Sequence, residues 1–518
     1  YFLGFAGFDL WPLSFVALIP LLVLLEQQGE AEHRLSGKRA LAVGVVFGSV
    51  THAGGYYWLI GMLEDFSGFP LPACIFFAAV VYLYQGGQLA FFFWLLARAR
   101  AHGWPLTPTA AAAYCAVELC YPLLFPSYYS NSLYDLPLLL QVVDLGGPIL
   151  LTALAIAVNG ALYEMGRALF GKKPLRRVLP AATGLALFFT LLYGWGRIGQ
   201  VEERAAEAVK ITVGVVQANM GMFQKRRDRL EGLRRHLEQS EQLQREVSPD
   251  LLVWPESAVN QVIPEGRRNV RRTFLGSINT PVLFGGLALR NEDGKRRLYN
   301  TAFITDREGN ILATYDKTYL LAFGEFLPFG ETFPVLYEWS PQSSHFTPGS
   351  HVKPLPFREW RLTALICYED IIPGFVRRAV AEGRPHLLVN VTNDSWFGDT
   401  TEPWIHQALA RFRAVEHHLY LVRATNSGVS AIIDPVGRVV RRSGVFERAS
   451  LHAQVAMLQG TTFYQLAGDW PGWLGLAWTL FAVFRRSRRT LNRGPGRSPG
   501  RAAGRSYPLR RQWSCRWR

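Results

Sequence analysis

The first two hundred residues are dominated by apolar runs with few charges, and one more such run lies near residue 475. Each run has about the 20 residues that a helix needs to cross a bilayer. Core helices of a soluble protein are the alternative, but so many consecutive runs favour a membrane domain. The chain begins at Tyr1 on an apolar stretch, so we expect a further span before it. Spans are predicted near Leu10–Leu25, Ala40–Leu63, Pro72–Leu96, Thr107–Phe125, Gly146–Tyr163, Val178–Trp195 and Trp470–Phe484.

Basic residues mark one side of these spans. Three alternate loops, at Glu26–Arg39, Ala97–Gly103 and Gly166–Arg177, together hold ten Lys and Arg residues. The two loops between them, at Glu64–Leu71 and Pro126–Gly146, hold none. Because loops rich in Lys and Arg stay in the cytoplasm, the segment after the sixth span is predicted to lie outside it.

Two carboxylates, Glu118 and Asp144, lie in or beside predicted spans. Charged groups are costly inside a bilayer, so such residues are candidates for function. Asp144 precedes the sequence Gly146–Gly147–Pro148, which favours a position at the outer interface. We interpret both carboxylates as packing or headgroup-level residues.

The central part of the chain has soluble patterning, in which short apolar runs bounded by turn residues alternate with helical patterns. Such alternation within one unit predicts an α/β layered fold. Helices are predicted over Asp228–Val247 and Ile405–Tyr420. Strands are predicted over Ile211–Gln217, Leu251–Trp254, Val282–Gly285, Thr301–Ile304, Leu362–Cys367, His386–Asn390 and Ser430–Asp434.

These patterns divide the chain into five predicted segments. Transmembrane helices fill residues 1–198, and the soluble domain fills 199–455. A linker at 456–469 leads to the last span at 470–486. Residues 487–518 form a basic tail, whose Gly, Pro, Ser and Arg content predicts disorder.

The net charge of +15 first suggests a nucleic-acid partner. However, 49% of the residues are hydrophobic and only 18% are charged, which is unlike a nucleic-acid-binding protein. Twelve arginines and no acid lie between Arg485 and Arg518, so the rest of the chain carries only +3. The excess is local, and we expect no nucleic-acid partner.

The cysteines and histidines show no metal or disulfide pattern. Cys74, Cys115 and Cys120 lie in apolar runs, and Cys515 lies in the tail. There is no CxxC pair and no HExxH sequence, so we expect neither a disulfide framework nor a metal site. Cys367 stands apart, because polar residues flank it.

Three reactive groups follow predicted strands. Glu256 in LLVWPES can lie in a poorly hydrated pocket and act as a general base. Lys317 in ATYDKTYL can stabilise an oxyanion, and Cys367 in RLTALICYED can act as a nucleophile if its thiolate is favoured. Taken singly, each residue could also have an ordinary structural role. Glu256 could be a turn carboxylate, Lys317 a surface lysine and Cys367 a core cysteine.

The sequence motifs around Glu256, Lys317 and Cys367 resemble the Glu-Lys-Cys signature of the nitrilase superfamily. The order and the spacing of the three residues are also similar to those of that family. LLVNVTNDSWFG and RATNSGVSAIIDPVG are further matching blocks. With the flanking spans, GEFLPFGE and GDWPGW, the chain to about Arg489 resembles the apolipoprotein N-acyltransferases, a membrane-embedded family. The resemblance implies an α-helical polytopic membrane domain and an extracytoplasmic α/β domain with the αββα sandwich of nitrilases.

The resemblance also implies a reaction. Cys367 would take an acyl chain from a phospholipid as a thioester, with Glu256 as the base and Lys317 at the oxyanion. The acyl chain would pass to the free amine of an S-diacylglyceryl-cysteine on an apolipoprotein, completing its maturation. Positions that the family needs around the pocket are matched by Glu325, Tyr368 and Glu369. Trp396, in an aromatic loop, is a further predicted substrate-binding or supporting residue.

The same resemblance implies no cofactor, phosphatidylethanolamine as the donor, and a monomer in the bacterial inner membrane with its catalytic domain on the periplasmic side. Aromatic loops at Phe323–Phe329 and Trp396–Phe397 would line an acyl groove or form ordinary pocket walls. Alanine at Glu256 or Lys317 is expected to abolish turnover and leave the fold intact. The alternatives are a membrane-tethered amidase that uses water, and a transporter or scaffold with an inactive nitrilase-like domain.

Overall fold

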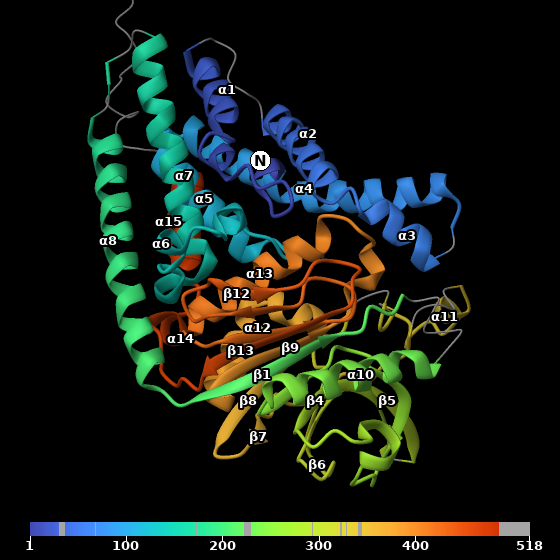
Figure 1. Cartoon of the computed structure of the whole chain (residues 1–518). Helices are drawn as coiled ribbons and strands as arrows, with labels where there is room; N and C mark the ends of the chain where they lie inside the picture. The colour runs from blue at the N-terminus through green and yellow to red at the C-terminus, as the bar shows by residue number, and fades with distance from the viewer. Residues whose placement is uncertain are drawn as a thin grey trace, which may run out of the picture.

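The computed structural model describes residues 1–30, 37–67, 69–171, 174–175, 177–221, 229–292, 294–321, 324–327, 329–339 and 344–485. Helices gather at one end of the molecule, and two β-sheets form the other end (Figure 1). The predicted tail at 487–518 lies outside the described residues.

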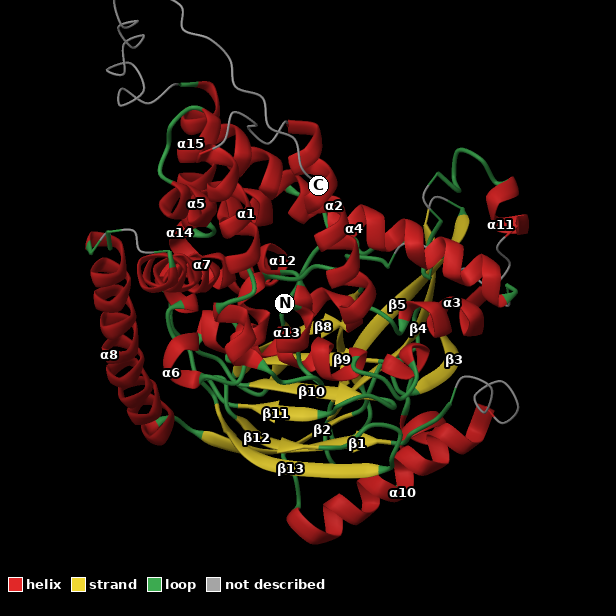
Figure 2. Ribbon diagram, turned by 90° about the horizontal axis from the view of Figure 1, so that it is seen from above, coloured by secondary structure: helices red, strands yellow, loops and turns green. Residues whose placement is uncertain are grey.

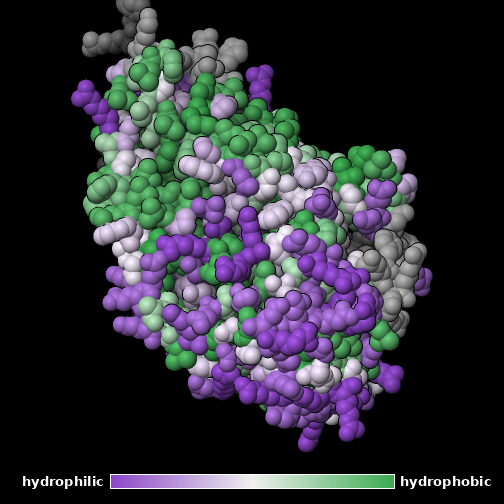
Figure 3. Space-filling view, viewed as in Figure 1, coloured by the Kyte–Doolittle hydropathy of each residue, from purple (hydrophilic) through white to green (hydrophobic). Residues whose placement is uncertain are grey.

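Among the described residues, three helices are long and apolar enough to cross a membrane, and all three lie in the helical half: α4 (Leu71–Ala101), α7 (Val143–Phe170) and α8 (Val178–Glu207). Large apolar side chains such as Phe76 on α4 and Phe189 on α8 are exposed. Figure 3 shows hydrophobic residues over this half and hydrophilic residues over the sheets. Shorter elements complete it: η1 Phe2–Gly4, η2 Trp11–Phe15, α1 Ile19–Glu30, α2 Gly37–Gly55, α3 Leu59–Ser67, α5 Leu106–Cys120, η3 Tyr129–Leu133, α6 Pro137–Leu140, and α15 Trp470–Phe484.

Two predicted spans are wrong as single helices. The run Leu10–Leu25 is divided between η2 and α1. The run Ala40–Leu63 breaks after Gly54 and Gly55, where α2 ends and α3 follows. A Cβ at Gly54 would lie 2.5 Å from the ring of Phe2, so this turn is shaped by aromatic packing from a distant part of the chain.

Helices α2 and α4 touch through small residues. A Cβ at Gly48 would lie 2.3 Å from the backbone oxygen of Gly86, and one at Gly44 would lie 2.5 Å from the Cα of Ala90. Without side chains at these positions the two backbones approach closely, as in other membrane helix pairs with small residues at intervals of four.

The other half contains two sheets. One has the order β13-β1-β2-β4-β5-β6, with β3 beside β4, and the other has the order β12-β11-β10-β9-β8-β7. The first sheet's strands are β1 Lys210–Gln217, β2 Leu251–Val253, β3 Val259–Pro264, β4 Val282–Glu292, β5 Lys295–Thr305, β6 Ile311–Asp316 and β13 Ala449–Ala456. The second sheet's strands are β7 Leu355–Phe357, β8 Trp360–Ile366, β9 Leu387–Thr392, β10 Leu421–Thr425, β11 Ala431–Ile433 and β12 Val439–Arg442.

The sheets pack face to face, and helices cover their outer faces (Figure 2). One core lies between the sheets, where Val213 of β1 and Leu365 of β8 are fully buried. Helix α10 (Arg229–Val247) covers the first sheet, and α12 (Pro373–Gly383) and α13 (Glu402–His417) cover the second. The remaining elements are η4 Arg271–Leu275, α11 Val335–Trp339, η5 Cys367–Ile371, η6 Asp394–Phe397 and α14 Phe463–Ala467.

This architecture confirms the predicted fold class, a helical membrane half with an αββα domain. Each predicted strand and helix of the central segment overlaps an observed one. Strands β3, β7, β10, β12 and β13 were not predicted. Strand β13 alternates between half-buried and exposed positions and lacks a strong apolar run, so its pairing with β1 reveals it.

A buried joint connects the two halves. Asp144 at the start of α7 accepts hydrogen bonds from Tyr193 and Arg197 of α8 and lies 2.9 Å from the ring of His418, which follows α13. The carboxylate of Asp144 is buried, and its ion pair with Arg197 measures 2.8 Å. This contact assigns Asp144 to packing between the halves, in line with its interpretation from the sequence.

Candidate active site

Strand direction places the three predicted reactive residues at one edge of the sandwich. Strands β8, β9 and β10 are parallel, as are β1, β2 and β4. Strand β6 runs in the same direction as β4, because both are antiparallel to β5. Glu256 and Lys317 therefore follow the ends of β2 and β6 on the same side of the first sheet. Cys367 follows β8 of the second sheet and lies close enough to both residues to interact with their charges.

Lys317 lies between two carboxylates. Its Nζ atom is 2.6 Å from Oε2 of Glu325 and 3.9 Å from Oε1 of Glu256. Asn300 of β5 donates to both carboxylates, at 2.6 Å to Glu256 and 2.8 Å to Glu325. The side chain of Lys317 is only 1% exposed. The structure thus brings Glu256, Lys317 and Glu325 together, and it adds Asn300, which the sequence analysis did not identify.

The environment of Lys317 keeps its ammonium charged. Burial alone lowers the pKa of Lys317, but the negative charges of Glu325 and Glu256, and that of Cys367 when it ionises, outweigh that effect and raise the pKa above its usual range. A buried ammonium fixed in this way can stabilise negative charge that develops on a substrate oxygen.

Cys367 begins the turn η5 directly after β8. Its φ of 51° is in the left-handed region, which non-glycine residues rarely adopt and which often marks a functional site. Asn390 of β9 donates to the backbone oxygen of Cys367 at 3.1 Å and helps to hold this conformation. Burial and the charge of Glu256 raise the pKa of the Cys367 thiol, against the opposing effect of Lys317. The resting thiol therefore needs a base to remove its proton.

Glu369 connects the turn at Cys367 to the segment after Lys317. Its Oε2 accepts from the backbone N–H of Ile366 at 2.8 Å. Its Oε1 accepts from the backbone N–H groups of Thr318 and Tyr319, at 2.8 and 3.0 Å, and from the hydroxyl of Tyr315. Burial raises the pKa of Glu369 to about 7, despite these hydrogen bonds. Glu369 thus ties the backbone before Cys367 to the segment after Lys317.

Tyr368 and Phe397, the residue after Trp396, both contact the helical half. The hydroxyl of Tyr368 donates to the backbone oxygen of Leu124 at 2.6 Å, across the boundary between the halves. Trp396 is half-buried in η6. The next residue, Phe397, packs edge to face on Trp58 with the ring centroids 5.1 Å apart. Aromatic packing beside Cys367 therefore joins the catalytic edge to the membrane helices.

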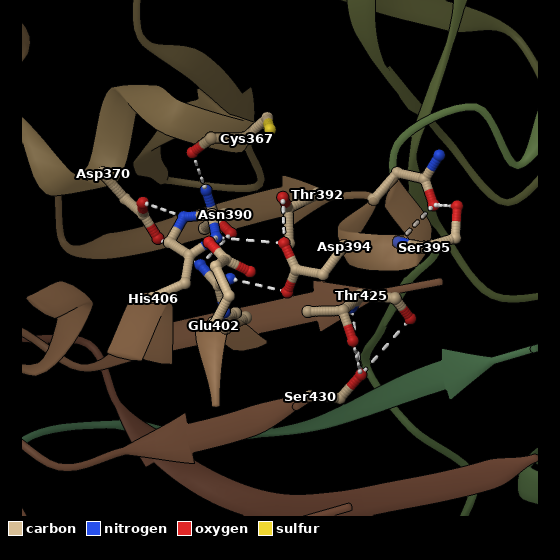
Figure 4. Close-up of polar contacts among 12 residues, drawn as sticks. Cys367, Asp370, Asn390, Thr392, Asp394, Ser395, Glu402, His406, Thr425 and Ser430 are labelled. Atoms are coloured by element: carbon tan, nitrogen blue, oxygen red, sulfur yellow. Dashed lines mark hydrogen bonds and ion pairs between the residues drawn. The ribbon is translucent and has the colours of Figure 1, made fainter. Parts of the chain in front are cut away.

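A buried ionic network lies behind the turn at Cys367 (Figure 4). His406 of α13 contacts Asp394 through Nδ1 and Asp370 through Nε2, each at 2.9 Å. Arg423 of β10 donates to the same two carboxylates and, at 3.0 Å, to Asn390. Since Asn390 holds Cys367, the network supports the turn from below.

The charges of this network are balanced. Burial and Arg423 lower the pKa of His406, but Asp370 and Asp394 outweigh them and raise it to about 10. Burial and the nearby Asp394 raise the pKa of Glu402 to about 8. His406 and Arg423 thus place two positive groups against the side chains of Asp370 and Asp394, and burial disfavours the charged form of Glu402.

Asp394, Glu402 and His406 present ligand atoms within 4.8 Å of one another, a spacing that could hold a metal ion. Both ring nitrogens of His406 already face carboxylates, and Arg423 supplies a second positive charge at the same place. We therefore interpret this cluster as part of the ionic network.

Several residues of the site have weak sequence signals. Asn300, Asn390 and Arg423 lie within apolar strands, and His406 lies within a buried helix. A polar residue inside an apolar run is the one signal that could have identified them, because such a residue needs a buried partner.

Comparison with known proteins agrees with this architecture. Residues 212–462 match the carbon-nitrogen hydrolase family, and residues 1–161 match the apolipoprotein N-acyltransferase N-terminal domain. Among solved structures, Nit3 of Saccharomyces cerevisiae, from branch 10 of the nitrilase superfamily, aligns over 50% of this chain and 93% of that chain with 18% identity and a TM-score of 0.37.

Relatives extend the similarity to both halves. The apolipoprotein N-acyltransferase of Geobacter metallireducens is 27% identical, over 93% of each chain. That of Azotobacter vinelandii is 32% identical over 521 residues, which cover 95% of this chain and 94% of the relative. Because this similarity spans the membrane helices and the sandwich together, the chain belongs to the apolipoprotein N-acyltransferase family.

Proposed function

We propose that the protein transfers an acyl chain from a membrane phospholipid to the N-terminal amine of S-diacylglyceryl-cysteine on apolipoproteins. The observation that carries this proposal is the position of Cys367. Its thiol lies on a left-handed turn near Lys317 and Glu256, and the next residue, Tyr368, bonds to the helical half at Leu124. A nucleophile at this boundary suits two substrates whose acyl chains stay in the bilayer.

In the first half-reaction, Glu256 accepts the thiol proton as the sulfur of Cys367 attacks an ester carbonyl of the phospholipid. Lys317 stabilises the negative charge on the carbonyl oxygen. The C–O bond to the glycerol then breaks, the proton passes from Glu256 to the leaving oxygen, and lysophospholipid departs. Cys367 retains the acyl chain as a thioester.

In the second half-reaction, the amine of the lipoprotein attacks the thioester. Glu256 accepts a proton from the amine, the C–S bond breaks, and the proton returns to the sulfur of Cys367. The product is an amide, which is more stable than the thioester. Water must be kept from the thioester, and the aromatic packing around Phe397 and Trp58 supports that exclusion.

The supporting residues have distinct proposed roles. Glu325 holds Lys317, and Glu369 positions the turn of Cys367. Tyr368 aligns the site with the membrane half, and Trp396 contributes to the wall near the acyl chain. No cofactor takes part in these steps.

The proposed setting is the inner membrane of a bacterium, with the sandwich on the periplasmic side. Ten basic residues in one set of loops against none in the other support this orientation. Phosphatidylethanolamine is the proposed donor, and the protein is proposed to act as a monomer.

The test follows the acyl group by mass spectrometry. Purified protein is incubated with phosphatidylethanolamine, and an acyl adduct is expected on Cys367 that disappears when a diacylglyceryl peptide is added. Cys367→Ala should lose the adduct, whereas Cys120→Ala, which removes an exposed cysteine of α5, should keep it. An adduct that survives Cys367→Ala would refute the mechanism. Transfer to water alone would favour a membrane-tethered amidase.

A further inference from the structure

A basic pocket lies at the boundary between the halves. It has a volume of about 540 Å³ and is lined by the loop before α6, by α13 and by the edge strand β12. Four arginines contribute to its wall, and Asp135 is the single carboxylate among the lining residues. The arginines are Arg411, Arg438, Arg441 and Arg442.

Arg411 and Arg438 are each paired with a carboxylate, whereas Arg441 and Arg442 have no carboxylate partner among the described residues. Arg411 bonds to Asp135 at 2.8 Å and to the backbone oxygen of Gly437 at 2.6 Å. Arg442 lies over the ring of Trp404, 5.4 Å from its centroid. Among the described residues, no carboxylate forms an ion pair with Arg441 or Arg442. The pocket therefore offers positive charge that the protein itself leaves uncompensated.

The pocket lies at the height of lipid headgroups. Arg438 pairs with Glu202 of α8 and so fixes the pocket beside that helix. Arg197 is the first charged residue after the apolar part of α8, and Glu202 follows five residues later. At 1.5 Å per residue this is about 7.5 Å along the helix. The headgroup layer extends about 5–8 Å beyond the hydrocarbon core.

The pocket is also separate from Cys367. Strand β12 lies four positions from β8 in the second sheet, and neighbouring strands are about 4.8 Å apart, so about 19 Å separates the two strands. A ligand in the pocket does not meet the reactive thiol.

We propose that this pocket binds the phosphate group of an anionic phospholipid headgroup. Guanidinium groups bind phosphate through paired hydrogen bonds, and the surplus of positive charge favours an anionic lipid over a zwitterionic one. The bound lipid would hold the sandwich against the membrane face. Binding of this lipid requires only that the helices lie in a bilayer, and it does not depend on the proposed acyl transfer.

The full chain, purified in neutral detergent, is titrated with phosphatidylglycerol or phosphatidylcholine of the same acyl chains, and native mass spectrometry measures the bound lipid. The parent should bind phosphatidylglycerol more tightly. The double variant Arg441→Glu with Arg442→Glu should bind it about thirtyfold more weakly or worse, as expected for the loss of two basic contacts. Equal binding by this variant and the parent would overturn the proposal.

A matched control reverses two exposed arginines, Arg267→Glu with Arg268→Glu. These residues lie beside the start of β6, at the end of the molecule away from the helices (Figure 1). The control should bind phosphatidylglycerol like the parent. Should the pocket variant fail to fold, Arg441→Gln with Arg442→Gln replaces it and is expected to show a weaker loss in the same direction.

Two further ligands distinguish the source of the anion. Inorganic phosphate should displace phosphatidylglycerol only at a large excess; displacement at equal concentration would indicate a soluble phosphate ligand and overturn the lipid assignment. An acidic peptide that the parent binds in place of phosphatidylglycerol, and that the pocket variant does not bind, would assign the pocket to a protein segment instead.

Discussion

Lys317 is buried against Glu325 and Glu256, and its charge therefore has two functions. It is proposed to offer a positive group to a substrate oxygen, and it compensates two carboxylates that have little access to water. Removing one partner of a buried ion pair leaves an uncompensated charge, which costs about 3–5 kcal/mol. Alanine at Lys317 is therefore expected to destabilise the fold, whereas the sequence alone predicted that the fold would stay intact.

Lys317→Ala should lower the free energy of unfolding by about 3–5 kcal/mol as well as abolish turnover. Lys317→Met combined with Glu325→Gln should recover most of that stability, because it removes both charges of the closer pair, yet remain inactive. Thermal unfolding in detergent and thioester formation are measured on the same samples. A stable Lys317→Ala protein would contradict the prediction.

The charge of Glu256 opposes ionisation of the Cys367 thiol, although Glu256 is the proposed base. Glu256→Gln should therefore lower the pKa of the thiol while it abolishes acyl transfer. The rate at which iodoacetamide alkylates Cys367 at pH 8 should rise, read by mass spectrometry, whereas alkylation of Cys120 should stay constant. A slower rate at Cys367 would show that Glu256 favours the thiolate and would reverse this assignment of charge effects.

At the scale of elements, the turn η5 depends on strands and a helix that follow it in the chain. Asn390 of β9 holds the backbone of Cys367, Arg423 of β10 holds Asn390, and His406 of α13 lies between the two carboxylates that Arg423 contacts. A fixed ionic network explains how a strained backbone at Cys367 persists, since the surrounding structure leaves it few alternatives.

His406→Gln should destabilise the protein in a pH-dependent way. The pKa of about 10 in the folded protein lies above the ordinary value of 6.5, so the imidazolium stabilises the fold. This contribution is complete below pH 6.5 and is lost as the pH rises toward 10. The melting temperature of the variant should be well below that of the parent at pH 6, and the gap should narrow toward pH 10.

The control for this series is His452→Gln, which removes an exposed histidine of β13. Its melting temperature should follow that of the parent at each pH. A gap for His406→Gln that widens with rising pH would mean that the imidazole is neutral in the folded protein.

At the scale of the whole molecule, the two halves behave as one body because buried polar contacts cross their boundary. Asp144 joins α7 and α8 to the residue after α13, and Tyr368 bonds to Leu124. The reactive thiol is thereby held at a fixed height relative to the membrane helices, which a reaction between two lipid-bound substrates requires.

Asp144→Asn should weaken this boundary. The carboxylate accepts from Tyr193 and Arg197 and lies 2.9 Å from the ring of His418, and hydrogen bonds to a charged group contribute about 1.5–3 kcal/mol each. The melting temperature should fall by several degrees and acyl transfer should fall with it. Asp65→Asn, at an exposed position of α3, should change the melting temperature little. Equal melting temperatures for both variants would exclude the joint as a source of stability.

The sequence by itself determined which parts of the chain are apolar, the α/β alternation of the central part, and the short motifs around Glu256, Lys317 and Cys367, because hydrophobic periodicity and short motifs are local properties. It also located the charge excess in the tail. It could not show that the run at Ala40–Leu63 bends, since the aromatic side chain that packs on Gly54 comes from Phe2.

The tertiary structure decided which groups surround those residues. Asn300, Asn390, His406 and Arg423 look like minor interruptions of apolar segments, and they acquire partners only when strands from both sheets end at one edge. The basic pocket likewise exists only where β12 meets the loop before α6. Burial gives these polar groups their energetic weight, and burial depends on contacts between residues far apart in the chain.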